Sequence, residues 1–192
     1  MPQTVHLIRH GETEWSASGR HTSSTDVPLT EEGRRAAERL RPLLAGLDLA
    51  LVLTSPRARA RDTAALAGVG DRAVVDEDLV EFGYGEYEGL TTPEIREKRP
   101  GWSVWDDDTP GGETVEDVGR RADRVIGRIL AAGGDVAVFA HGHLLRVLGA
   151  RWIELPPRAG ASLALSTAAV CRLGFEREHR AIRAWNDTCR LR

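Results

Sequence analysis

Two histidines of this chain stand directly after short apolar runs. His10 follows the apolar residues 5–8, and His141 follows residues 136–140, which are typical of a buried strand. Because α/β proteins build their active sites at the carboxyl ends of parallel strands, both side chains are predicted to face one pocket. A neutral imidazole can act as a nucleophile and hold a transferred group covalently. The pair therefore predicts a catalytic site rather than two packed histidines.

Basic side chains accompany the two histidines. Arg9 directly precedes His10, and Arg59 follows a second apolar run at residues 49–54. The planar guanidinium group matches the oxygens of a phosphate. A helix that begins at Pro56 would also direct backbone N–H groups toward an anion. A phosphate monoester is therefore the substrate that these residues suit.

Two further groups complete the chemistry of phosphoryl transfer. An attacking imidazole must donate from its other nitrogen to a carbonyl, and the backbone near Gly11 could supply that acceptor. A departing alkoxide needs a proton donor. Glu81 lies in a loop rich in glycine and aromatic residues and could fill that role. A single glutamate is usually a solvated surface charge, so the prediction depends on the other residues of the site.

The spacing of apolar residues predicts the elements that position these groups. Apolar runs alternate with helical repeats, which is typical of a mostly parallel sheet between two layers of helices. We predict one domain over residues 1–192 with an α/β fold, a three-layer α/β/α sandwich. Strands are predicted at 4–9, 49–54, 72–76, 136–140, 163–167, 169–176 and 181–185, and helices at 30–45, from Pro56, at 113–130 and at 143–153. Residues 81–112, rich in glycine, proline, tryptophan and acidic groups, are predicted to cap the pocket.

The composition excludes several classes of protein. The 192 residues carry a formal net charge of -3, whereas nucleic-acid-binding domains are usually basic, so no nucleic-acid partner is predicted. No apolar run approaches the ~20 residues that span a bilayer, and the N-terminus lacks the pattern of a signal peptide. We therefore predict a cytoplasmic protein without a membrane partner. Cys171 is predicted to be buried and Cys189 lies in the tail, and a disulfide is not needed at this size.

Four motifs, in this order along the chain, resemble those of the histidine phosphatase superfamily, which has the phosphoglycerate mutase-like fold. They are Arg9-His10-Gly11, Ser55-x-x-x-Arg59-Ala60-x-x-Thr63, Glu81 ahead of Gly85-x-x-Glu88-Gly89, and His141-Gly142. By this resemblance His10 is the nucleophile that becomes phosphohistidine, and Glu81 is the proton donor. Arg9, Arg59 and His141 would complete the phosphate pocket, with His141 either cationic or hydrogen-bonded to the transferring group. The resemblance implies no metal and no organic cofactor.

The interval between Glu81 and His141 distinguishes the branches of this superfamily. The resemblance implies that mutases of this superfamily are longer chains with an extended insertion in this interval. The interval in this chain is short, which leaves a wetter pocket and favours hydrolysis. Finer motifs are similar to those of sedoheptulose-1,7-bisphosphatases and actinobacterial broad-specificity acid phosphatases. That resemblance implies a substrate side formed by Gly11, Ser16, His21, Thr22, Tyr84, Gly142 and His143.

Two positions depart from that branch, in which many relatives have asparagine at position 16 and glycine at position 23. Ser16 could still bind phosphate, with a shorter reach. Ser23 carries a Cβ atom that disfavours positive φ, so a different loop path is predicted there. Trp102 and Trp105 could either close over a substrate or pack within their segment.

Three functions remain open at this point. The first is a histidine acid phosphatase-type phosphomonoesterase that acts without metal on small phosphorylated metabolites such as sugar phosphates. The second is a 2,3-bisphosphoglycerate-dependent phosphoglycerate mutase, and the third is a non-catalytic module that binds a phospho-ligand. We predict the first, with a small-molecule partner. His141-x-His143 has no third ligand at metal-binding spacing, so no metal site is predicted. The late strands around Cys171 could form a homodimer interface.

Overall fold

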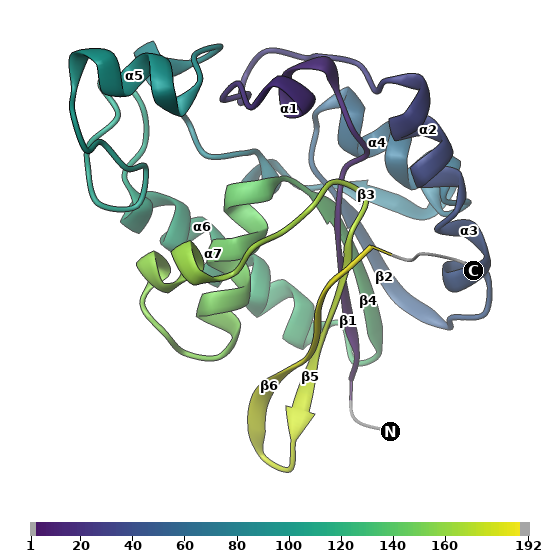
Figure 1. The fold of residues 1–192 in the computed structure, drawn as a ribbon. Coiled ribbons are helices and arrows are strands. Elements are labelled where there is room, and N and C mark those ends of the chain that lie inside the picture. The colour runs from purple at the N-terminus through teal and green to yellow at the C-terminus, as the bar shows by residue number, and fades with distance from the viewer. Residues whose placement is uncertain (1–2, 189–192) are drawn as a thin grey trace.

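The protein is built around one six-stranded sheet with the strand order β3-β2-β4-β1-β5-β6 (Figure 1). This computed structural model describes residues 3–188. The strands are β1 (Val5–Arg9), β2 (Leu49–Thr54), β3 (Ala73–Val75), β4 (Asp135–Ala140), β5 (Val170–Glu176) and β6 (His179–Asp187). The helices are α1 (Glu14–Ser18), α2 (Glu31–Glu38), α3 (Arg41–Ala45), α4 (Ala58–Leu66), α5 (Thr92–Lys98), α6 (Val115–Ala131) and α7 (Gly142–Trp152).

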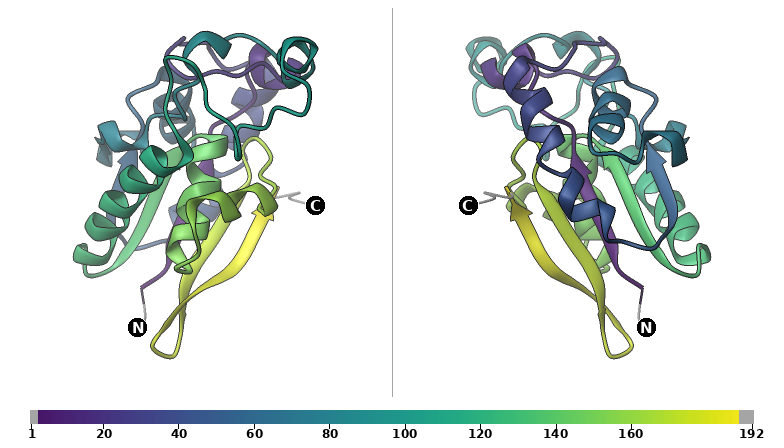
Figure 2. Two further views of the ribbon diagram at one scale, coloured as in Figure 1. Left: turned by 90° about the vertical axis from the view of Figure 1, so that its left-hand side faces the viewer. Right: turned by 90° about the vertical axis from the view of Figure 1, so that its right-hand side faces the viewer.

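Helices cover both faces of the sheet, as Figure 2 shows from two sides. α2, α3 and α4 lie on one face, and α6 and α7 lie on the other. The central strand β1 contributes to the core on both faces, with Leu7 in one apolar cluster and Ile8 in the other. Continuous apolar strands are what a sheet covered on both faces requires. The predicted α/β/α class is confirmed.

The direction of the strands brings the two strand-end histidines together. β3, β2, β4 and β1 run parallel, whereas β5 and β6 form an antiparallel hairpin at one edge. Arg9 at the end of β1 lies opposite Ala140 at the end of β4. The backbone N–H of His10 donates to the Ala140 carbonyl at 3.0 Å. The imidazole centroids of His10 and His141 consequently lie only 5.2 Å apart.

The helices predicted at 30–45 and from Pro56 are wrong in their limits. The first is divided into α2 and α3, because Pro42 lacks the N–H that a continuous helix would need at that position. Pro42 instead lies in the first turn of α3, where no N–H bond is required. Pro56 precedes the next helix rather than opening it, since α4 begins at Ala58.

The strand predicted at residues 163–167 is also wrong. These residues follow a 3-10 helix, Pro157–Ser162, and form an irregular segment. The carbonyl of Leu165 accepts a hydrogen bond from the side chain of Arg9 rather than from a neighbouring strand. Ala168 has a left-handed φ of 55°, which ends the segment before β5. The other predicted strands and helices are present with their ends shifted by at most two residues.

The loop after β1 is pressed against the start of α2. A Cβ atom at Gly11 would lie 2.4 Å from the carbonyl oxygen of Gly33. A Cβ atom at Gly33 would lie 2.2 Å from the carbonyl oxygen of Glu12. Only glycine fits at both positions, and the Gly11 N–H also donates to Thr63 Oγ1 at 3.0 Å. These contacts fix the backbone next to His10.

Residues 81–112 lie over the carboxyl edge of the sheet and contain α5 (Figure 1). A capping box opens α5: the Thr91 hydroxyl accepts from the Glu94 N–H, and the Glu94 carboxylate accepts from the Thr91 N–H. Glu94 also pairs with Arg20 at 3.4 Å, which ties the segment to the loop after α1. That the segment is a cap within a single domain stays a prediction.

Helix length and cysteine burial bear on two further predictions from the sequence. None of the helices described is both long and apolar enough to cross a bilayer. Cys171 is buried in β5, and burial raises the pKa of its thiol to about 11, so it is an unreactive packing residue. Cys189 lies outside the described residues.

Candidate active site

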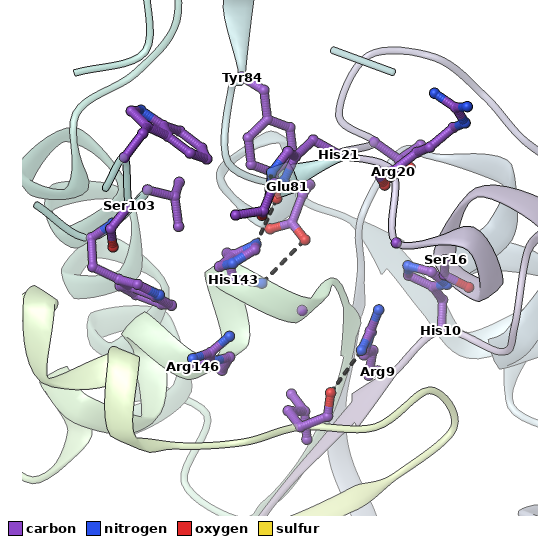
Figure 3. Close-up of a pocket in the computed structure, with 18 of the residues that line it drawn as sticks. Arg9, His10, Ser16, Arg20, His21, Glu81, Tyr84, Ser103, His143 and Arg146 are labelled. Atoms are coloured by element: carbon purple, nitrogen blue, oxygen red, sulfur yellow. Dashed lines mark hydrogen bonds between the residues drawn. The ribbon is translucent and has the colours of Figure 1, made fainter. Parts of the chain in front are cut away.

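A cavity of about 340 Å³ opens at the carboxyl edge of the sheet, beneath residues 81–112 (Figure 3). Its wall contains most of the predicted site residues, namely Arg9, His10, Ser16, His21, Thr22, Glu81, Tyr84, Gly142 and His143. Gly11, Arg59 and His141 do not reach the wall and are buried close to His10 instead. The motifs that are far apart in the sequence therefore meet at one place.

His10 is held in the form that a nucleophile needs. Its Nδ1 lies 2.7 Å from the Gly11 carbonyl oxygen, the acceptor expected from the sequence. Because a carbonyl can only accept, Nδ1 carries the hydrogen and Nε2 keeps its lone pair. Burial, followed by the charges of Arg9 and Arg59, lowers the pKa of His10 well below 6.5. The imidazole is therefore neutral and nucleophilic at neutral pH.

Two arginines supply positive charge at this end of the cavity. Arg9 lies in the wall and donates to the Leu165 carbonyl at 2.7 Å. Arg59 is fully buried and donates to the carbonyl of Thr25 at 3.0 Å and to two further carbonyls of the same loop. The Nε atoms of both arginines have no hydrogen-bond partner in the described part of the chain. Because buried cationic donors without partners are costly, these atoms are suited to bind an anion.

His141 is fully buried and has one unpaired ring nitrogen. Its Nε2 lies 2.7 Å from Ser55 Oγ, and its Nδ1 has no hydrogen-bond partner among residues 3–188. Burial and the charge of Arg59 lower the pKa of His141 well below 6.5. The lowered pKa favours the hydrogen-bonding alternative for His141 over the cationic one, and the role of the residue stays a prediction. The hydrogen-bonding alternative remains, with Nδ1 as the available atom.

Glu81 links the capping segment to the start of α7. The side chain is 6% exposed and lies in the cavity wall. Its Oε1 accepts from the backbone N–H groups of Phe82 and Leu144, each at 2.9 Å, and its Oε2 accepts from that of His143 at 3.1 Å. These three backbone donors bind both oxygens of the Glu81 side chain. Glu81 is thereby held in one orientation.

Arg121 holds the backbone from which Glu81 projects. It donates to the carbonyls of Asp78 at 2.7 Å and Val80 at 3.0 Å, and it pairs with Glu113 at 2.7 Å. Sequence reasoning missed this residue. The signal that could have found it is its place among buried apolar residues of α6, where an arginine must have internal partners. Arg121 is a positioning residue for the segment around Glu81.

A cluster of ring side chains forms another part of the wall. The Tyr84 hydroxyl lies 2.6 Å from Nδ1 of His143, and the His21 ring lies 4.6 Å from the Tyr84 ring. Burial lowers the pKa of His143 well below 6.5 and lowers that of His21 to about 4. Burial also raises the pKa of Tyr84 well above 10. All three rings are therefore neutral at neutral pH.

The two positions that depart from the resembling branch have local roles. Ser16 lies in the wall, but its hydroxyl donates to the Thr13 carbonyl at 3.0 Å and accepts the Thr13 N–H in a capping box. Ser23 does not have the positive φ that glycine would allow, and its N–H donates to the Glu88 carboxylate at 2.9 Å. Thr22, next to it, donates to the Arg20 carbonyl at 3.0 Å.

The sequence predicts that the start of α4 serves the anion site. The Ala58 N–H donates to the carboxylate of Asp26 at 2.9 Å, so a side chain already caps this helix. The Ala58 N–H is thus already bound to a carboxylate, and phosphate binding by the other N–H groups after Pro56 stays a prediction. A carboxylate from a distant loop competes for the helix terminus, and no local pattern reveals that contact.

Several wall residues were not assigned to the site from the sequence. They are Gly19, Arg20, Thr92, Arg96, Ser103, Val104, Arg146 and Leu165, together with Trp102 and Trp105 from the capping segment. The signal for Arg146 was available, because it lies three residues after His143 and thus on the same face of α7.

Within the described residues, no group of three or more His, Cys, Asp or Glu side chains is arranged to hold a metal ion.

The chain matches the histidine phosphatase superfamily (branch 1) over residues 5–188. It belongs to this superfamily. An acid phosphatase of Mycobacterium tuberculosis is 46% identical over 174 residues, which are 88% of this chain and 85% of that protein. Sedoheptulose 1,7-bisphosphatase of Saccharomyces cerevisiae is 39% identical over 181 residues, which cover 78% of this chain and 67% of the relative. A solved structure of an open reading frame product from M. tuberculosis has a TM-score of 0.91 at 43% identity, covering 96% of this chain and 97% of that one.

These comparisons confirm the family predicted from the motifs. The two named relatives are phosphatases, which supports hydrolysis rather than the mutase alternative. The catalytic roles of individual residues in this histidine phosphatase rest on their geometry and are proposed below.

The buried histidines make the stability of this histidine phosphatase depend on pH. In the fold His10, His21, His141 and His143 have pKa values below 6.5, whereas in the unfolded chain they take up protons near that pH. The unfolded chain then binds more protons, so the free energy of unfolding should fall as the pH falls below 6.5. For His21, with a pKa of about 4, the loss between pH 6.5 and 4 is ~3 kcal/mol.

Calorimetric melting at pH 7, 6, 5 and 4 measures this effect. His21→Gln should show a smaller decrease in Tm over this range than the unaltered protein. The control His179→Gln, at the exposed start of β6, should show the full decrease. An identical pH dependence in all three proteins would refute a contribution from His21.

Proposed function

We propose that this protein hydrolyses small phosphate monoesters without a metal ion, through a phosphohistidine intermediate on His10. The observation that carries the proposal is the neutral His10 ring, whose Nδ1 is bound to the Gly11 carbonyl. Nε2 is then the nucleophilic atom, and Arg9 and Glu81 lie in the same cavity wall. A hydrogen-bonded nucleophile, a cationic anion site and a carboxyl group are what phosphoryl transfer requires.

In the first step Nε2 of His10 attacks phosphorus, and the bond from phosphorus to the ester oxygen breaks. Arg9 binds the phosphoryl oxygens from the cavity wall, and Arg59 and Nδ1 of His141, which are buried close to His10, complete the anion site when phosphate is bound at His10. Glu81 then gives its proton to the departing oxygen, so the alcohol leaves neutral.

In the second step water replaces the alcohol. The Glu81 carboxylate takes a proton from water while the water oxygen attacks phosphorus, and the bond from phosphorus to Nε2 breaks. The products are inorganic phosphate and the neutral His10 ring. Glu81 thus acts as an acid in one step and as a base in the next, and its fixed position between the cavity and the start of α7 serves both.

The substrates that we propose are sugar phosphates and similar metabolites. The support comes from the relatives, one of which is named a sedoheptulose 1,7-bisphosphatase and another an acid phosphatase. A cavity of about 340 Å³ is at the lower end of the range for small-molecule sites. A cytoplasmic location and a homodimer stay predictions.

Phosphate release by EDTA-treated protein tests the proposed function. The substrates are p-nitrophenyl phosphate, fructose and sedoheptulose bisphosphates, and 3-phosphoglycerate. We expect phosphate release from one or more of them, and equal rates after Mg²⁺ is added back. Conversion of 3-phosphoglycerate to 2-phosphoglycerate in the presence of 2,3-bisphosphoglycerate, with little phosphate release, would instead identify a mutase. Ligand binding without either reaction would identify a non-catalytic module.

A further inference from the structure

The cavity extends beyond the residues that the proposed reaction uses. Figure 3 shows His10 and Arg146 on opposite sides of the cavity, with Arg9 between them. Arg146 projects from α7 into the wall, next to Trp105 of the capping segment and to His143. When the reacting phosphate of the substrate is bound at His10, the rest of the substrate occupies the side of the cavity next to Arg146.

The Arg146 side chain is fixed in place by the protein. Its Nε donates to the Gly160 carbonyl at 3.0 Å, and its Nη2 donates to the Ala161 carbonyl at 2.9 Å. The guanidinium group lies 4.5 Å from the centroid of the Trp105 ring. Gly160 makes this packing possible, because a Cβ atom there would lie 3.0 Å from both the Arg146 backbone and the Trp105 ring. A stacked arginine held in this way loses little conformational entropy when it binds a ligand.

The positive charge of Arg146 is not neutralised by an ion pair. No carboxylate of residues 3–188 forms a salt bridge with it, and its Nη1 makes no hydrogen bond to those residues. The nearby Glu81 is bound instead to the backbone at the start of α7. A half-buried guanidinium group that keeps a free donor is suited to an anionic ligand.

His143 provides a second donor on the same face of the helix. The Tyr84 hydroxyl keeps its proton and can donate it to Nδ1 of His143. Nε2 of the neutral ring then carries the hydrogen and can donate it. Arg146 lies one helical turn, about 5 Å, beyond His143.

We propose that Arg146, supported by Trp105 and assisted by His143, binds a second anionic group of the substrate, a phosphate or a carboxylate. This inference rests on the proposed function, in which the first phosphate is bound at His10. Arg146 selects substrates that carry two anionic groups over those that carry one. It is a specificity-determining residue and takes no part in bond breaking.

Matched pairs of substrates test the proposal. Fructose 1,6-bisphosphate is compared with fructose 1-phosphate and fructose 6-phosphate, and 3-phosphoglycerate with glycerol 3-phosphate, which lacks the carboxylate. In Arg146→Met we expect kcat/KM to fall for the substrate with two anionic groups by at least tenfold more than for its partner with one. Most of this loss should be an increase in KM. Arg146→Lys should restore part of the preference. Arg151→Met, on the same helix but paired with Asp123 outside the cavity, is the control and should keep the ratio of the unaltered protein.

Which of the two pairs responds identifies the second anion as phosphate or carboxylate. Equal losses for both members of every pair, or no change for either, would overturn the proposal. A binding experiment separates this outcome from failure of the proposed function. In His10→Ala, calorimetry should show tighter binding of the ligand with two anionic groups than of its partner with one. Adding Arg146→Met should lower the ratio of the two affinities at least tenfold. An unchanged preference would overturn the subsite even if no turnover were observed.

Discussion

Replacement of His10 by alanine is expected to lower kcat for phosphate release by about 10³-fold or more. The reason is that His10 supplies the nucleophilic nitrogen of the proposed reaction. Nε2 of His10 keeps a lone pair because Nδ1 is bound to the Gly11 carbonyl, and the lowered pKa keeps the ring neutral. His143 is neutral too, but its Nδ1 lies 2.6 Å from the Tyr84 hydroxyl, on the far side of Glu81.

Steady-state phosphate release and rapid quenching measure this prediction. The unaltered protein, mixed with labelled substrate and quenched in alkali, should carry label that is lost in acid, as expected for a phosphorus–nitrogen bond. His10→Ala should carry none. His179→Ala, at the exposed start of β6, is the matched control and should behave as the unaltered protein does. More than a tenth of the normal rate in His10→Ala would contradict a nucleophilic role.

The position of His10 and His141 could be predicted from the sequence for a simple reason. Both follow apolar runs, parallel strands end at a common edge, and β1 and β4 are neighbours in register. The hydrogen bond of His10 to Gly11 is also local, since it joins adjacent residues. Neighbouring residues and the geometry of a parallel sheet were sufficient to predict the positions of the two histidines and the hydrogen bond of His10.

Contacts between distant segments could not be predicted in the same way. Asp26 caps α4 from a loop far from it in sequence, and the Ala58 N–H donates to its carboxylate. The position of the Arg146 side chain depends on two carbonyl groups of the 3-10 helix Pro157–Ser162. The sequence did not predict this helix and instead predicted a strand directly after it, at residues 163–167. The lowered pKa of His141 depends on burial, which the motif alone does not specify. Side-chain partners and desolvation are properties of the folded chain.

Replacement of Glu81 by glutamine is expected to affect the two steps of the reaction differently. With an alkyl phosphate such as a sugar phosphate, the departing oxygen needs a proton, and loss of the acid should lower kcat by about 10²- to 10⁴-fold. With p-nitrophenyl phosphate the departing phenolate is stable without a proton. The first step should then remain fast, while the second step, which needs Glu81 as a base, becomes slow.

Stopped-flow absorbance distinguishes these effects. Glu81→Gln with p-nitrophenyl phosphate should give a burst of about one phenolate per active site, followed by slow turnover, because phosphohistidine accumulates on His10. Glu86→Gln removes an exposed carboxylate from the same loop and should show normal turnover. The amide oxygen of glutamine can still accept from the N–H groups of Phe82 and Leu144, whereas its NH2 group cannot accept from that of His143. Equal slowing of both substrates without a burst would mean that Glu81 positions the site rather than transferring protons. A burst confined to Glu81→Gln requires that the same carboxyl group acts as the base of the second step.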